Sequence, residues 1–323
     1  MNLSRRTVLD VSLLILVNGM WAAQYSAYKV ATEKMGPITV SAWTFLMASL
    51  VLLPFLVRER NRRRPSNDPA ATTPVEEDCP GGWPWKARDI RGFIMIGVVG
   101  LIPASALLAW GVERSTASNA AIIYLTVPII TAILASLILT ERMTLVRWLS
   151  LGISLVGVLI LSDVNWRALQ LANSKFLLGN VLVLLACTAS AFYNVYCKDL
   201  LRRFSPLEVL VYGYVIALVA SLPLLVWVEP FSLGALRTYG ARIWLALAVL
   251  SVFSWGLAMV LWMFLLTRLD VSQASVSIYL LPFLGVLISA VALKEPITPT
   301  MIFGGLITLV GTIIITSIEP TSV

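Results

Sequence analysis

Four polar and aromatic side chains near the start of the chain share one face of an expected helix. Asn18, Trp21, Tyr25 and Tyr28 follow an i, i+3, i+7, i+10 pattern, which matches the helical repeat. An amide and aromatic rings on one face can bind a small molecule by hydrogen bonding and by stacking. Packing of neighbouring helices through hydrogen bonds explains the pattern equally well. We take Asn18, Trp21 and Tyr25 as candidate binding residues.

Further candidates of the same kind lie in later stretches. A shift of 169 positions, as from Lys29 to Lys198, carries the stripe onto Ser190 and Asn194. Two tryptophans lie far from the ends of their hydrophobic runs, where they could stack on an apolar substrate. The remaining candidates are Tyr124, Trp255, Trp262, Ser275 and Tyr279.

Two prolines inside hydrophobic runs are candidates for bending or gating. Pro128 and Pro282 each leave the carbonyl four residues earlier without its helical hydrogen bond, at Tyr124 and Ile278. Such carbonyls can bind a substrate, or the backbone there can flex. A static kink is an equally good explanation.

The residues that would carry covalent or metal chemistry are missing. The 323-residue chain has no histidine, and its three cysteines form no C-x-x-C pair, so histidine bases, histidine-bound metals and a disulfide framework are not expected. A phosphate-binding G-x-x-x-x-G-K-[ST] loop is absent, and the middles of the hydrophobic runs hold no Asp or Glu. We therefore expect no catalytic residue, no metal and no cofactor. A small zwitterionic or neutral substrate fits better than a polyanion.

The elements that must position these residues are hydrophobic runs. The chain is 59% hydrophobic and only 13% charged, and its runs approach the roughly 20 residues that a membrane helix needs. We predict an all-α integral membrane protein with ten transmembrane helices. The runs are Val8 to Val30, Pro37 to Val57, Gly92 to Trp110, Ala117 to Leu139, Leu145 to Leu161, Lys175 to Tyr196, Pro206 to Trp227, Arg242 to Leu266, Val271 to Ala292 and Thr300 to Ile318.

The basic residues predict the orientation of the chain in the membrane. The net charge is +7, but the Lys and Arg residues cluster between the hydrophobic runs, which indicates a lipid bilayer and not a nucleic acid as partner. With alternate sides assigned, sixteen of the 24 lie on the side of both termini and eight on the other. We therefore expect both termini in the cytoplasm. The polar stretch of about 59–90 is predicted to be a disordered cytoplasmic loop that marks topology, or alternatively binds anionic lipid.

The chain contains an internal repeat. At a shift of 154 positions Pro128 meets Pro282 and Glu141 meets Glu295. A unit of five spans has an odd number of crossings, so a second copy enters the membrane from the opposite face. We predict two inverted five-helix units, 1–162 and 175–318, as in many secondary transporters.

Glu141 and Glu295 follow the fourth and ninth runs, at opposite membrane surfaces. They are gating candidates if they pair with nearby bases, although capping of the helix that follows is the plainer explanation. Gly157, Gly304 and Gly311 lie on the fifth and tenth runs and predict close helix packing. A dimer interface is the alternative there, and we expect a monomer.

The chain resembles the EamA repeat of the drug/metabolite transporter superfamily. The resemblance rests on Gly36-Pro37-Ile38-Thr39, on Ala117 to Leu139 ending in Glu141, and on Leu293-Lys294-Glu295-Pro296 of the second copy. It covers the chain except the long loop and both tails. Family members often carry an arginine seven residues after the proline of the second helix, where this chain has Thr44. Among the branches it looks most similar to bacterial aromatic amino acid exporters.

These observations lead to one main hypothesis. We expect an alternating-access exporter of amino acids, preferably aromatic or other apolar ones, in a bacterial inner membrane. A transporter of another small metabolite or drug, such as a nucleoside, a sugar or a cationic drug, is the alternative. A membrane-embedded lipid enzyme is a remote alternative, because the nucleophile and base that it needs are missing.

Overall fold

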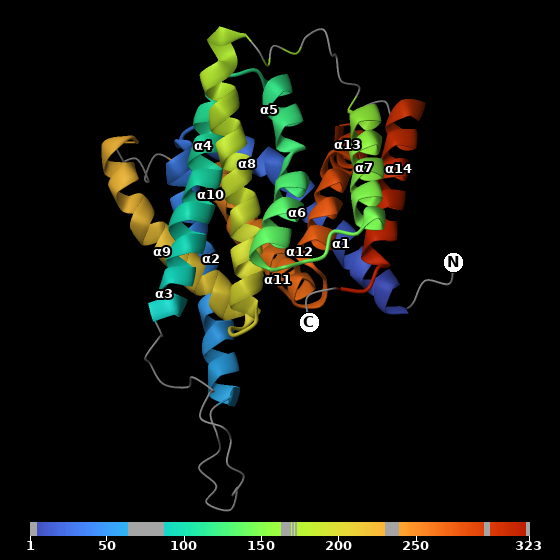
Figure 1. Cartoon of the computed structure of the whole chain (residues 1–323). Helices are drawn as coiled ribbons and strands as arrows, with labels where there is room; N and C mark the ends of the chain where they lie inside the picture. The colour runs from blue at the N-terminus through green and yellow to red at the C-terminus, as the bar shows by residue number, and fades with distance from the viewer. Residues whose placement is uncertain are drawn as a thin grey trace, which may run out of the picture.

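The computed structural model describes residues 5–63, 87–162, 169, 171, 173–229, 239–293 and 298–320. Within these ranges every regular element is a helix (Figure 1). The bounds are α1 Arg5–Thr32, α2 Pro37–Arg63, α3 Ala87–Ile94, η1 Met95–Leu101, α4 Ile102–Glu113, α5 Ala117–Tyr124, α6 Val127–Ile138, α7 Leu145–Leu161, α8 Ser174–Leu201, α9 Pro206–Trp227, α10 Ala241–Ala248, η3 Val249–Ala258, α11 Met259–Arg268, α12 Val271–Val276, η4 Ser277–Tyr279, α13 Leu280–Leu293 and α14 Pro299–Thr316.

These helices account for all ten hydrophobic runs. Within the described ranges, nine stretches are long and apolar enough to cross a membrane. The shorter apolar helix α7, Leu145–Leu161, supplies the tenth run. The all-α membrane fold expected from the sequence is confirmed.

Sequence-encoded caps fix where several helices begin. The Ser205 side chain accepts from the N–H of Glu208, whose carboxylate accepts from the N–H of Ser205, so α9 begins with a capping box. The side chains of Thr144 and Thr298 each accept one bond from the backbone N–H three residues later, which caps the start of α7 and of α14. The predicted loop of about 59–90 was too long at both ends, because α2 continues to Arg63 and α3 begins at Ala87. Residues 64–86 lie outside the described part of the chain.

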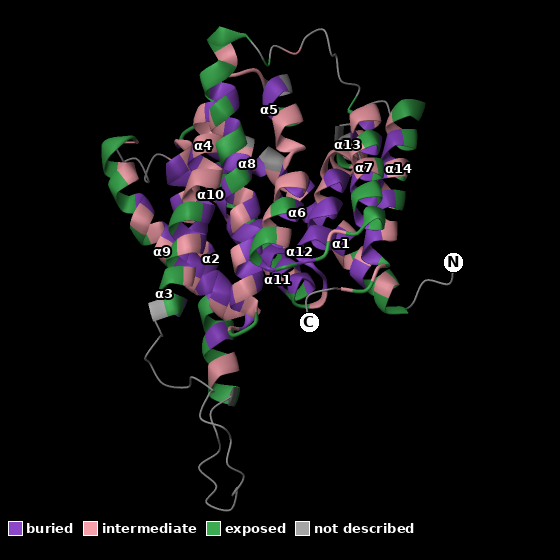
Figure 2. Ribbon diagram, viewed as in Figure 1, coloured by how far each residue is buried: buried purple, intermediate pink, exposed green. Residues whose placement is uncertain are grey.

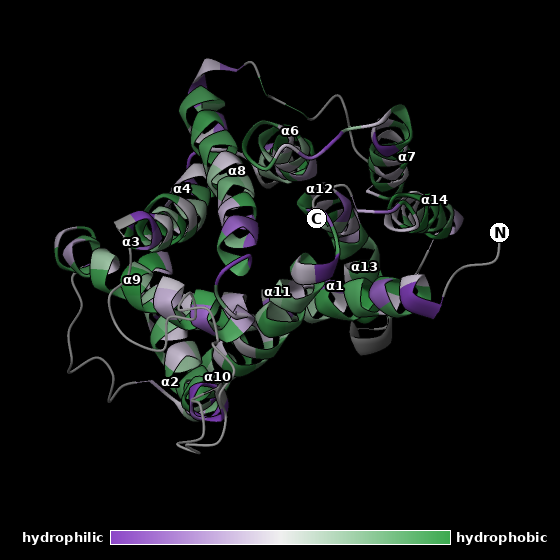
Figure 3. Cartoon of the chain, turned by 60° about the horizontal axis from the view of Figure 1, so that its bottom comes forward, coloured by the Kyte–Doolittle hydropathy of each residue, from purple (hydrophilic) through white to green (hydrophobic). Residues whose placement is uncertain are grey.

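The outer helix faces are apolar and the centre is buried. Large exposed side chains such as Leu50, Leu137, Val226 and Phe303 point away from the bundle, as expected of a surface that contacts lipid tails. Figure 2 shows the buried residues along the inner helix faces. In Figure 3 the helix bodies are mostly hydrophobic, and the polar residues gather near their ends.

Two membrane spans change to a wider π-helix at matching places. One segment begins at Met95 and the other at Val249, which is 249 − 95 = 154 positions later. π-helical turns are rare inside α-helices and are frequent at functional sites. Their recurrence at one repeat interval accompanies a shared pattern of small residues, Gly97 and Gly100 in one copy and Ser251 and Ser254 in the other.

Two other spans are interrupted just before their prolines. The span with Pro128 is divided between α5 and α6 by a turn at Leu125 and Thr126, and in the span with Pro282 the 3₁₀ segment η4 separates α12 from α13. A proline lacks the backbone N–H that would bridge each interruption.

Helices α7 and α14 approach one another very closely. A Cβ on Gly157 would lie 2.6 Å from the backbone nitrogen of Thr308, and one on Gly311 would lie 2.9 Å from that of Ser154. Ser154 donates to the Thr308 carbonyl at 3.3 Å, and Thr308 donates to the Ser154 carbonyl at 3.4 Å. The glycines are thus used for packing within the chain.

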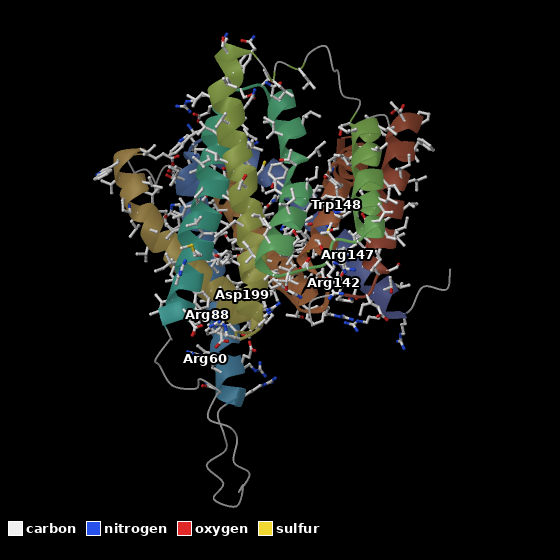
Figure 4. The ribbon with its side chains drawn as sticks, in the orientation of Figure 1. Arg60, Arg88, Arg142, Arg147, Trp148 and Asp199 are labelled. Carbon is white, nitrogen blue, oxygen red and sulfur yellow. The ribbon has the colours of Figure 1, made fainter. Side chains whose placement is uncertain are left out.

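The two ends of the molecule differ. We call the end that carries Arg6, Arg60, Arg88, Arg142 and Arg203 the basic end; it lies low in Figures 1 and 4. There α12 packs against α6, α7 and α14. Its repeat counterpart α5 packs against α4 and α8, but among the described residues it forms no such packing with α7, α13 or α14.

Candidate functional site

Three of the candidate residues meet in the centre of the bundle. The rings of Trp21 on α1 and Trp262 on α11 have centroids 5.1 Å apart at 58°. The Trp262 indole N–H donates to the side-chain oxygen of Asn194 on α8 at 3.0 Å. Asn194 in turn donates to the Ser190 carbonyl at 3.2 Å. We call Trp21, Asn194 and Trp262 the central group; Trp262 is fully buried, whereas Trp21 is half-buried.

A second aromatic cluster lies against the π-helical segment η3. The Trp255 ring meets Phe45 edge-on, with centroids 5.3 Å apart at 83°, and Phe45 stacks on Tyr214 at 5.5 Å. The Tyr214 hydroxyl donates to the Trp255 carbonyl at 2.8 Å. This bond gives a partner to a carbonyl within the widened turn, where regular helical bonding is lost.

The first and ninth spans meet through candidate polar groups. Asn18 donates to Ser277 Oγ at 2.9 Å and to the Leu14 carbonyl at 2.8 Å, while its own side-chain oxygen is buried with no partner. Tyr279 donates to the Leu125 carbonyl at 2.8 Å, beside the interruption before Pro128. Ser275 donates to the Ser272 carbonyl at 3.1 Å and is fully buried. Asn18 and Tyr279 thus join different spans, whereas the Ser275 bond stays within α12.

Other candidates are placed less informatively. Ser190 and Tyr124 are half-buried, and Tyr124 packs in a cluster with Val183 and Cys187. Pro128 is buried and Pro282 is half-buried at the helix interruptions. The side chain of Tyr25 and the whole of Glu295 lie outside the described residues.

Glu141 contacts the other half of the chain and not the helix that follows it. Its carboxylate accepts from the N–H of Val271 at 2.8 Å, from the N–H of Ser272 at 3.1 Å and from Ser272 Oγ at 2.6 Å. The plainer prediction, capping of the next helix, is wrong, because Thr144 caps α7. Burial raises the pKa of the Glu141 carboxyl, and Asp270 adds to this, whereas the bonds from Ser272 and Val271 oppose it.

A buried ion pair lies beside Glu141. Arg147 on α7 and Asp270, immediately before α12, are 2.6 Å apart and both are fully buried. Arg147 also donates to the Glu319 carbonyl at 3.1 Å. Lys198 at the end of α8 donates to the carbonyls of Leu266 and Leu269 at 2.6 and 2.9 Å. We call Glu141, Arg147, Lys198 and Asp270 the charged cluster; Arg147 and Arg142 are labelled in Figure 4.

Sequence reasoning missed most of this cluster. The sequence pattern marks Arg147 only as an orientation signal, and Lys198 as an orientation signal and as the repeat match of Lys29, since each lies within a turn or two of a helix end. Asp270 was not singled out. The available signal was its position as the residue before a run that opens Val271-Ser272-Gln273, which is a capping-box pattern, and the capping box is present.

At the opposite end, the carboxylate of Glu229 binds the start of a helix as Glu141 does. Glu229 follows α9 and accepts from the N–H of Ile38 at 3.0 Å, the N–H of Thr39 at 2.8 Å and Thr39 Oγ1 at 2.9 Å. It therefore holds the first turn of α2 from the other half of the chain.

The site offers recognition and no covalent chemistry. The central group brings two indole rings and an amide together inside the bundle, and such groups, when accessible, suit a small solute with an apolar or aromatic side chain and polar groups. Among the described residues, no group of three or more Cys, Asp or Glu side chains could hold a metal ion.

Comparison with known families matches the same profile twice. The profile of the EamA-like transporter family matches residues 9–163 and again residues 177–317. A solved structure described as "Crystal structure of protein" superposes with a TM-score of 0.72 over 96% of both chains, at 17% identity. That likeness concerns the fold alone.

Curated relatives are similar over nearly their whole length. A "Probable terminal-alkyne amino-acid exporter" of Streptantibioticus cattleyicolor is 25% identical over 305 residues, covering 94% of this chain and 91% of that protein. An "Uncharacterized transporter" of Archaeoglobus fulgidus is 23% identical over 305 residues, covering 94% of this chain and 97% of that protein.

Proposed function

The chain belongs to the EamA-like transporter family, and from this premise we propose that it exports amino acids, preferably aromatic or other apolar ones, by alternating access. It is a multi-pass membrane transporter and not an enzyme. The observation that carries the substrate class is the central group, in which Trp21, Trp262 and Asn194 come together from three helices. A relative named as a probable amino-acid exporter supports the same class.

The proposed mechanism rests on an inverted repeat. Contacts between residues 154 positions apart support it: Ser154 and Thr308 bond reciprocally, and Tyr279 bonds Leu125. Two inverted units can exchange conformations, so that either side opens in turn. We assign this structure to the state closed at the basic end, and we place that end and both termini in the bacterial cytoplasm.

Flux into proteoliposomes tests the substrate class. Purified protein should give saturable uptake of labelled phenylalanine that unlabelled tryptophan competes and that protein-free liposomes lack. Uptake of a nucleoside, a sugar or a cationic drug with no amino-acid flux would favour the alternative class. Absence of flux for every aromatic, threonine or methionine substrate, from protein shown to be folded, would overturn the proposal.

A further inference from the structure

We propose that the Arg147–Asp270 ion pair is a one-sided gate, which forms when the basic end closes, must separate for that end to open, and has no ion pair at the repeat-equivalent positions, Met301 and Thr116. The inference rests on the alternating access proposed above. It names gating residues that are not members of the central group.

The charged cluster is built for a closed state. Two cations and two anions lie together, and the exposed fractions of Glu141, Arg147, Lys198 and Asp270 are 2%, 0%, 7% and 0%. Arg147 comes from the first half of the chain, whereas Asp270 comes from the second. A buried charge needs a partner. Arg147 therefore holds the second half of the chain in its present position, and Asp270 holds the first half.

The short segment from Asp270 to Gln273 makes several of the contacts that join the two halves at this end. Asp270 pairs with Arg147, and Ser272 donates to Glu141. The Gln273 side chain donates to the carbonyls of Ile315 and Ile318 at 2.8 and 2.7 Å. The segment thus joins α12 to the α6–α7 connection and to the end of α14.

The repeat indicates that this segment moves. Its counterpart at the other end, the start of α5, forms no packing of similar extent with α13 or α14 among the described residues. In an inverted pair, the second conformation exchanges the two arrangements. The start of α12 would then leave α6, α7 and α14, which separates Asp270 from Arg147.

The same repeat indicates that the gate is one-sided. A shift of 154 carries Arg147 to 147 + 154 = 301, which is Met301, and Asp270 to 270 − 154 = 116, which is Thr116. Thr116 caps its own helix by accepting from the N–H of Asn119 at 3.1 Å. Neither residue carries a charge, so the opposite end cannot form this pair.

Separation of spin labels across the basic end tests the gate. Labels at Arg142→Cys and Arg202→Cys, in a chain whose native cysteines are replaced by alanine, would flank the cluster. Asp270→Asn and Arg147→Gln each leave one buried charge without its partner, which disfavours the closed state. We expect each variant to raise the population of the longer distance at least several-fold.

A charge reversal and two controls make the test specific. Arg147→Asp combined with Asp270→Arg should return the distribution toward that of the wild type, and Arg147→Lys should do so partly. Labels at Val156→Cys and Val310→Cys on the closely packed α7 and α14 should keep one distance throughout. Glu33→Gln, which removes an exposed pair with Arg242 at the other end, should change nothing at the basic end.

Two outcomes would overturn the gate. One is an unchanged distance distribution in both single variants; the other is a reversed pair that folds, as judged by gel filtration and the α7–α14 distance, yet stays as open as the singles. The labels need no transported solute. Failure of amino-acid flux with an intact label response would therefore reject the substrate class and leave the gate standing.

Discussion

Glu141 and Glu229 use their carboxylates in the same way at opposite ends of the molecule. Each accepts from two successive backbone N–H groups and from the hydroxyl of the second residue, Ser272 or Thr39. The bonds are charge-assisted, so they are stronger than those between neutral groups. Each carboxylate also lies where the partial positive charge of a helix start favours an anion. A carboxylate of one half thus holds the first turn of a helix in the other half.

At the residue scale, Trp262→Phe should impair substrate binding more than folding. The variant keeps the ring beside Trp21 but removes the N–H that reaches Asn194. Leaving the Asn194 oxygen without this bond costs on the order of 1–3 kcal/mol. We expect a rise in KM for phenylalanine of about tenfold with a smaller change in kcat, measured in proteoliposomes.

Trp148→Phe is the matched control, because Trp148 lies 40% exposed on α7 and should leave KM unchanged. Equal losses in both variants would argue that indole removal acts through general destabilisation and not through the central group.

At the element scale, hydrophobic length and repeat spacing predicted the ten spans because a bilayer imposes both. The same patterns brought Trp21, Asn194 and Trp262 together, since inward helix faces are marked by polar and aromatic residues. They could not predict the partner of Glu141, which lies 130 and 131 positions away. Nor could they show that Arg147 is buried, because a basic residue near a helix end is typical of orientation signals as well.

The π-helical segments were not predicted from the sequence. η1 reads Met-Ile-Gly-Val-Val-Gly-Leu and η3 begins Val-Leu-Ser-Val-Phe-Ser-Trp, so both copies place a small residue at the third and sixth positions, but such a pattern also occurs in ordinary packed helices. Their matching positions are set by the packing of whole spans, which local propensity does not report.

The closeness of α7 and α14 leads to a prediction about glycine. Gly157→Ala would push a methyl group against the backbone of Thr308 and the Gly304 carbonyl, at 2.6 and 2.8 Å. Neither partner is a flexible side chain, so overpacking should cost roughly 1–3 kcal/mol. We expect a lower apparent Tm in detergent, followed by tryptophan fluorescence.

Gly152→Ala provides the comparison on the same helix, because a Cβ there meets nothing within 4 Å. It should be neutral or stabilising by up to about 1 kcal/mol, since alanine favours helix over glycine. A Gly157→Ala protein as stable as Gly152→Ala would contradict the close approach of the two helices.

At the scale of the whole molecule, the two ends differ in both packing and charge. At the basic end α12 packs against its neighbours beside the charged cluster, whereas the start of α5 lacks packing of similar extent among the described residues. In Figure 1, α5 and α13 are well separated toward the top, in line with this difference. Glu141 belongs to this cluster, and burial raises the pKa of its carboxyl.

Acidification should therefore favour closure of the basic end. Burial raises the pKa of Glu141 above its ordinary value of 4.5 and outweighs the bonds from Ser272 and Val271, which lower the pKa, and opening would return the carboxyl to water. The closed state then binds the proton more tightly, so the added stability is complete below 4.5 and is lost as pH rises through the raised pKa. Repulsion from Asp270 raises the pKa of Glu141 further. The cations Lys198 and Arg147 also lie near these two carboxylates.

The Arg142 and Arg202 label pair measures this directly between pH 7.5 and pH 5. We expect the open population of the wild type to fall as pH is lowered, and that of Glu141→Gln, which cannot be protonated at this position, to respond much less. The reason is linkage: only a group whose proton affinity differs between two states can move their balance. If acid instead opened the basic end of the wild type, the dominant effect would be repulsion between Arg147 and Lys198 once a neighbouring carboxylate is neutralised. Glu141 would then not be the group that senses protons there.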